Sequence, residues 1–407
     1  MRALWFKKRR PIKGAFVIVF LVFLALVCSV HTYKVAFAEG DKDIGAEDAA
    51  WTGVEENIFE QLDNLELEDL QAYVDSLGGF LDGDIAQRLL DYINGENVDY
   101  EDIIRNFVYI FLDGVQALLP AFAGIIAISL TSGLLTMVRG EKGGGSSVDA
   151  IHLITYISAL IPILSIVIEC YSACSRCLSS MSKQAVLVFP PMRTLLAASG
   201  GSVTASICRP AIVFFSSTII SVVQNVVFPL TGVIIAFSVA SNLTDQLKIS
   251  KFTAFFKSIN KWVIGVSVSV FGIFFTVQGI TSATYDGVVR RAAKYAIGTG
   301  VPIVGGFLSG GFDLAVAGSI LIKNALGSMG IALLVFVLLE PVVLLISVTI
   351  LMRMTAAITQ PFGDSRISDF LGETADNLQY CMAGLLLTAF LYFLSIVLMI
   401  CCTEAIL

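Results

Sequence analysis

Long apolar runs separated by short polar stretches dominate the chain from residue 103 onward. Runs of this length with few charges are typical of transmembrane helices. We predict spans at 115–138, 150–170, 211–241 (interrupted at Pro229), 262–284, 329–352 and 378–402. The segments 185–207 and 299–322 are shorter or rich in small residues, which makes them candidates for re-entrant segments. The expected fold is therefore an all-α polytopic membrane protein with about six to eight membrane segments.

The N-terminus has a different pattern. Cationic residues from Arg2 to Lys13 precede the apolar run 14–30, and Ala36-Phe37-Ala38 follows it. These features predict a secretory signal peptide, residues 1–38, that is cut after Ala38. An uncleaved signal anchor is the alternative, because seventeen apolar residues nearly suffice to cross a bilayer. In both cases residue 39 begins outside the cytoplasm.

Residues 39–102 predict a small, acidic, helical segment on the extracytoplasmic side. Apolar residues at helical spacing indicate one helix between Leu62 and Leu77, closed by Gly78-Gly79, and another between Ile85 and Ile93. The segment is too small to bury a large core. We expect it to dock on the membrane domain, residues 103–407, or on a partner.

Composition and charge support this division. The 407 residues are 56% hydrophobic and only 14% charged, whereas soluble domains carry about 25% charged residues. Residues 1–38 hold seven Lys or Arg and no acid, while residues 39–102 hold twenty acids against two basic residues. The chain is not basic overall and contains no nucleic-acid-binding motif, so no nucleic-acid partner is predicted.

A stretch dense in small residues, 298–318, is the predicted functional centre. Close glycine spacing allows helix backbones to approach in a bilayer, and a Gly/Pro-broken segment can line a cavity. The candidates for packing or for a pathway here are Pro302, Gly306, Gly310, Gly311 and Asp313. The sequence suggests an internal repeat, 148–258 and 260–370, in which Ser199, Gly200 and Gly201 match this stretch. Chance similarity between spans rich in small residues is the alternative explanation.

Charged residues within or beside the spans are further candidates. Glu340, Asp313 and Glu169 are acids near membrane depth, where a carboxylate is costly and usually faces a cavity or a partner. The alternative is that Glu169 lies at the interface and that Glu340 supports the break at Pro341. Candidates for contacts with a partner or with lipid are the cations Lys248, Lys251, Arg290, Arg291 and Lys294.

Catalytic chemistry finds little support. The spacing of Cys170, Cys174 and Cys177 resembles that of cluster-binding cysteines in soluble radical enzymes, but these thiols end an apolar span, where cysteine is a common small residue. Only His152 remains after signal removal, so a histidine-based zinc site or a catalytic triad is not supported. We expect neither enzymatic activity nor a cofactor.

A series of motifs in fixed order resembles the stage III sporulation protein AE family of endospore-forming bacteria. The motifs are Phe189-Pro190, Leu195–Gly201, Phe228-Pro229-Leu230, Val277-Gln278-Gly279, Asp286-Gly287-Val288, Arg291–Tyr295, Val301–Gly305, Lys323-Asn324-Ala325-x-Gly327 and Gln360-Pro361-x-Gly363-Asp364-Ser365. The resemblance is strong over about 185–400. Before that range only the general character matches, namely an acidic region that follows a signal peptide. No single motif would be specific.

The resemblance implies a multi-pass protein of the mother-cell membrane around the forespore, acting in a secretion-like channel complex that joins the two cells. Implied partners are other products of the same operon, including a secretion-type ATPase and ring-forming membrane proteins, and through them a forespore-membrane protein. The family offers no catalytic residues to carry over. A stand-alone secondary transporter for a small solute is the alternative, which the broken segments and the membrane acids support.

Overall fold

The computed structural model describes most of the chain after residue 57. The described residues are 58, 61–62, 65, 67–77, 84–93, 100–140, 145–199, 218–243, 249–274, 305–361, 363 and 365–401, all within the unit Asn57–Leu407. For residues 92, 100–108, 136–140, 145–149, 151–152, 305–315 and 401 the description covers the backbone alone. The predicted signal peptide lies outside the described residues.

The described residues are almost entirely helical and contain no strand, which confirms the all-α class for this part of the chain. The elements are α3 (Glu68–Ser76), α4 (Ile85–Ile93), α5 (Tyr100–Gly140), α6 (Gly145–Ala198), α8 (Ile220–Val222), the π-helix η2 (Val223–Val227), α9 (Phe228–Leu243), α11 (Gly305–Thr359) and α12 (Ser365–Cys401). Residues 250–274 form one more helix, and Lys251 lies in its first turn.

Five described helices, α5, α6, α9 with its preceding turns, α11 and α12, are long and apolar enough to cross a membrane. Two of them correct the predicted span boundaries. The predicted span 150–170, the loop after it and the start of the segment 185–207 form one continuous helix, α6. Likewise α11 joins 305–322 to 329–352 without a break. The stretch 171–184 contains neither Gly nor Pro, so nothing in it ends a helix.

The lengths of α6 and α11 exceed what a bilayer needs. With 54 and 55 residues they extend about 80 Å at 1.5 Å per residue, whereas the hydrocarbon core is about 30 Å thick. About twenty residues of each helix can therefore lie in the hydrocarbon. The remainder must be covered by water, lipid headgroups or protein.

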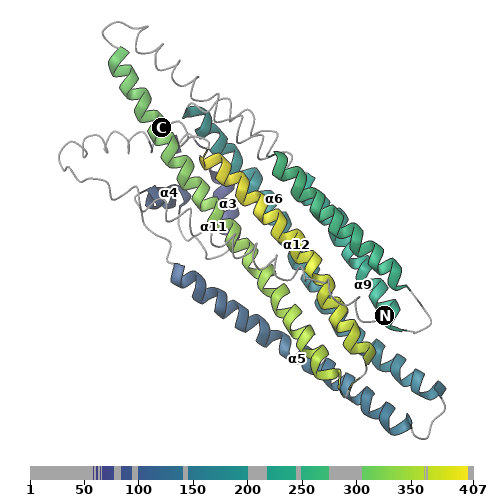
Figure 1. Cartoon of the computed structure of the whole chain (residues 1–407). Helices are drawn as coiled ribbons and strands as arrows, with labels where there is room; N and C mark the ends of the chain where they lie inside the picture. The colour runs from purple at the N-terminus through teal and green to yellow at the C-terminus, as the bar shows by residue number, and fades with distance from the viewer. Residues whose placement is uncertain are drawn as a thin grey trace, which may run out of the picture. The chain divides into compact units, whose positions relative to one another are not determined.

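Helix α12 lies at the centre of the packing. Figure 1 shows it beside α11 along its length, with α9 on another side, and it also contacts α6. In the most apolar window of α12, 72% of the residues are buried, against 22% in α5. Most apolar side chains of α12 thus meet protein, whereas many of those on α5 are exposed.

The two short acidic-segment helices pack on the long ones, close to the predicted positions. Leu70, Tyr73 and Val74 of α3 are buried, and α3 contacts α6, where the Tyr73 hydroxyl donates to the Ser180 carbonyl at 3.2 Å. Helix α4 contacts α11 and buries Ile85 and Leu89. Burial raises the pKa of Tyr73 to about 12. This segment therefore docks on the helical body through apolar faces.

Candidate functional site

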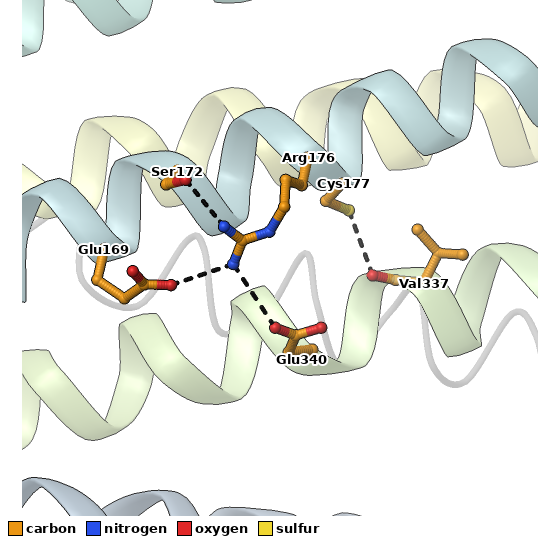
Figure 2. Close-up of polar contacts among 6 residues, drawn as sticks. All are labelled: Glu169, Ser172, Arg176, Cys177, Val337 and Glu340. Carbon is orange, nitrogen blue, oxygen red and sulfur yellow. Dashed lines mark hydrogen bonds and ion pairs between the residues drawn. The ribbon is translucent and has the colours of Figure 1, made fainter. Parts of the chain in front are cut away.

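Charged side chains meet between α6 and α11, two of the helices long and apolar enough to span a membrane. Figure 2 shows Arg176 of α6 reaching toward Glu340 of α11. Its Nη2 atom lies 3.1 Å from Glu169 Oε1 and 3.9 Å from Glu340 Oε1, and its Nη1 donates to Ser172 Oγ at 2.8 Å. We call Glu169, Ser172, Arg176 and Glu340 the ion cluster.

Helix periodicity explains why Glu169, Ser172 and Arg176 lie on one face of α6. Glu169 and Arg176 are seven residues apart, which is two turns, and Ser172 lies one turn before Arg176 on the same face. The antiparallel course of α11 brings Glu340 to the same level. The Arg176, Glu169 and Glu340 side chains are 57%, 61% and 77% exposed, so none is buried by the described chain.

A proline next to Glu340 creates a second link between the two helices. Pro341 lies inside α11 and has no N–H, so the carbonyl of Val337, four residues earlier, lacks its usual helical donor. The thiol of Cys177, a buried residue of α6, donates to that carbonyl at 3.3 Å (Figure 2). Cys177 therefore supports the helix at this proline.

Small and polar residues bring α6 close to α11 and bring α12 close to η2. The buried Gln184 amide donates to the Gly330 carbonyl at 2.7 Å. A Cβ added at Gly330 would meet Val188 at 3.2 Å, and one added at Gly384 would meet Val223 at 2.9 Å. These glycines make the close approach that small residues allow. Close helix packing was predicted at 298–318 and not at Gly330 or Gly384, although Gly327 and Gly330 are spaced at i, i+3, which places them on one face of α11.

Most of the predicted site residues lie where the structure gives no side-chain description. Glu340 is in the ion cluster, Ser199 is buried at the end of α6 and Lys251 is exposed on the helix 250–274. The residues of the α11 start are described as backbone only: Gly306, Gly310, Gly311 and Asp313. Outside the described residues are Gly200, Gly201, Lys248, Arg290, Arg291, Lys294 and Pro302. The predicted repeat likewise depends on such residues and stays a prediction.

A second polar contact layer joins α12 to its neighbours and was not predicted. Arg353 of α11 donates to Asp376 of α12 at 2.7 Å, and Asn377 donates to Ser238 of α9 at 3.2 Å. Asp376 and Asn377 are adjacent and therefore point to different sides of the helix. Each is an ordinary polar residue in the sequence, and only the packing of three helices identifies its partner.

The arrangement suits positioning and charge compensation. Within the described residues no group of three or more His, Cys, Asp or Glu side chains is placed to hold a metal ion. Cys170, Cys174, Cys177 and Cys381 are free and buried. Cys170, Cys174 and Cys177 lie within the continuous helix α6.

Comparison with known proteins gives one consistent result. The family model described as stage III sporulation protein AE matches residues 84–403. A curated protein of Bacillus subtilis (strain 168) named stage III sporulation protein AE is 26% identical over 325 residues, which is 79% of this chain and 81% of that protein. No solved structure matches. The matched range contains the ion cluster and every described helix from α4 onward.

Proposed function

Since the chain belongs to the stage III sporulation protein AE family, which supports a role in sporulation, we propose that it is a non-enzymatic membrane subunit of a channel or secretion-like complex joining mother cell and forespore. The match over residues 84–403 is the observation that carries this proposal. The partners that the family resemblance implies are a secretion-type ATPase and ring-forming membrane proteins of the same operon, and we propose them for this chain. Through these proteins the complex meets a forespore-membrane protein.

The exposed ion cluster supports a role in an assembly. Charges on a lipid-facing surface are costly, so such residues normally face a water-filled path or another protein. Arg176 is 57% exposed and Glu340 is 77% exposed, on two helices that are long and apolar enough to span a membrane. A neighbouring subunit or an aqueous conduit beside α6 and α11 would remove this cost. The proposed location is the mother-cell membrane around the forespore, with residues 39–102 outside the cytoplasm.

The test is purification of a tagged, functional chain from sporulating cells in mild detergent, followed by mass spectrometry. Recovery of the ATPase and the ring-forming proteins is the expected result. Arg176→Glu should reduce their recovery, because it reverses the cluster's only cation. Arg193→Glu is the matched control, since Arg193 lies on the same helix and makes no ion pair with a described residue. Recovery of the chain alone from cells that still require it would contradict the proposal.

A stand-alone transporter for a small solute is the second candidate, and the exposure of Glu340 favours it as well. The Glu340 carboxylate is 77% exposed and lies 3.9 Å from the Arg176 guanidinium, so a cationic solute or ion can reach it. In that case the purified chain alone should catalyse uptake in vesicles, and Glu340→Gln should abolish it. Uptake by the chain without partners would favour this candidate over the complex.

A further inference from the structure

A polar groove lies on the surface between α6 and the α8–η2 segment. It has a volume of about 370 Å³ and is lined by Ser179, Ser182, Lys183, Ile220, Ser221, Gln224 and Asn225. Six of these seven side chains are polar, although both helices belong to segments apolar enough to span a membrane. A volume above about 300 Å³ is in the range of small-molecule sites.

The π-helix accounts for the shape of one wall. Residues 223–227 form η2, and residues 218–219 also have π-helical geometry. Such segments are rare and are often found at functional sites, because the wider turn changes which side chains share a face. Here the polar residues Ser221, Gln224 and Asn225 line the groove, while Val223 and Val227 are buried on the other side.

Hydrogen bonds within the walls leave hydroxyl hydrogens available to a ligand. The Asn225 amide donates to Ser221 Oγ at 3.0 Å, and the Gln224 amide donates to Ser179 Oγ at 3.4 Å. Both serine oxygens thus act as acceptors. In the described part of the chain no acceptor receives the hydroxyl hydrogens of Ser179, Ser182 or Ser221.

The groove carries the positive charge of Lys183, which no ion pair with a described residue compensates. Lys183 is exposed and makes no ion pair or hydrogen bond with any described residue. No acidic side chain is among the lining residues. An ammonium group with three hydroxyl donors nearby matches an anion with several acceptor oxygens. The non-bridging oxygens of a phosphate group carry enough lone pairs to accept hydrogen bonds from all four donors.

We propose that the groove formed by Ser179, Ser182, Lys183, Ser221 and Asn225 binds a phosphate-bearing anion. Lys183 supplies the charge and the three serine hydroxyls supply directed hydrogen bonds. The phosphate belongs either to a phospholipid headgroup or to a soluble phosphate compound, and the chemistry of recognition is the same for both. The site is separate from the ion cluster, whose side chains do not line it.

The experiment measures binding to the purified full-length chain in detergent by equilibrium dialysis and calorimetry. The probes are inorganic phosphate, short-chain phosphatidylglycerol and, as a lipid without phosphate, short-chain diacylglycerol. Saturable binding of phosphate or of phosphatidylglycerol is expected, and diacylglycerol should not bind. Saturation by inorganic phosphate would assign the site to a soluble compound, whereas binding of phosphatidylglycerol alone would assign it to the headgroup of a lipid.

Variants connect the binding to the groove. Lys183→Gln should raise the Kd about tenfold or more, since a hydrogen bond to a charged group is lost. The triple variant of Ser179, Ser182 and Ser221 to Ala should do the same, while Lys183→Arg should retain binding. Lys261→Gln removes an equal charge from an exposed site outside the groove and should leave the Kd unchanged.

Two outcomes would overturn the proposal. One is the absence of saturable binding of either phosphate probe to the wild-type chain. The other is an equal loss of binding in Lys261→Gln and Lys183→Gln, which would show that surface charge alone attracts the anion. Because all the substituted side chains are at the surface or partly exposed, thermal unfolding of the variants should match the wild type and exclude misfolding as the cause.

Discussion

Cys177 donates its thiol hydrogen to the carbonyl of Val337, 3.3 Å away and 160 residues distant in the sequence. This carbonyl is the one that Pro341 leaves without a helical donor. The contact ties α6 to α11 beside the ion cluster, which lies on the same two helices. An unsatisfied carbonyl inside a packed helical layer is costly, so the thiol has a defined structural role.

The first prediction concerns this pair. Cys177→Ala should lower the free energy of unfolding by about 0.5–1.5 kcal/mol, because the partly buried carbonyl of Val337 loses its donor. Cys177→Ser keeps a donor and should be less harmful. In the background of Pro341→Ala, which restores an N–H to α11, Cys177→Ala should cost less. Thermal unfolding in detergent of the four variants of this double-mutant cycle gives the coupling energy, and a coupling near zero would contradict the assignment.

The second prediction concerns helix packing at Gly384. An alanine Cβ there would lie 2.9 Å from Val223 and 3.4 Å from Val227, two stiff β-branched side chains of η2. Overpacking of about 1–3 kcal/mol should exceed the gain of about 1 kcal/mol in helix propensity. Gly372, on the same helix, has nothing within 4 Å of an added Cβ. Gly372→Ala should thus be neutral or stabilising, and equal melting temperatures for the two variants would refute the packing argument.

The third prediction separates function from stability at Glu340. Its 3.9 Å ion pair with Arg176 is exposed, and exposed pairs contribute about 0–1 kcal/mol. Glu340→Gln should therefore leave thermal unfolding almost unchanged and yet reduce spore formation strongly. The measurements are the melting temperature of the purified protein and the count of heat-resistant spores. Normal spore counts for Glu340→Gln would remove Glu340 from the proposed functional surface.

The fourth prediction is a pH dependence at the contact between α3 and α6. The pKa of Tyr73 is raised to about 12 chiefly by burial, with a smaller contribution from Cys177, while the side chain of Ser180 acts in the opposite direction. Between pH 10 and 12 the unfolded state releases this proton before the folded state does, so stability should fall as pH rises through that window. Below pH 10 this contribution is fully present.

Tyr73→Phe provides the control for that prediction. The phenylalanine variant lacks the ionisable hydroxyl, so the part of the alkaline loss of stability due to Tyr73 should disappear. Denaturation curves recorded at several alkaline pH values for both proteins give the difference. Identical pH profiles would show that Tyr73 is not protected by its contact with α6.

Local sequence patterns determined the class of the protein and the positions of several elements. Apolar periodicity predicted helices near 62–77 and 85–93, and the structure has α3 and α4 there, with Leu70, Tyr73, Val74, Ile85 and Leu89 buried. Hydropathy predicted the membrane character, and the family motifs predicted the family that the comparisons show. These properties depend on neighbouring residues or on order along the chain, which a sequence displays directly.

Tertiary structure alone decided the lengths of the helices and the partners across them. The polar stretch 171–184 continues α6 and does not interrupt it, since it contains no residue that ends a helix. Its polar groups have partners on neighbouring elements: the Gln184 amide donates to the Gly330 carbonyl of α11, and the Gln224 amide of η2 donates to the Ser175 carbonyl. Arg176 meets Glu340, and Cys177 meets Val337, only because α6 and α11 pack antiparallel in one register. Such pairs are separated by more than a hundred residues, and local propensity carries no information about which helices will pack together.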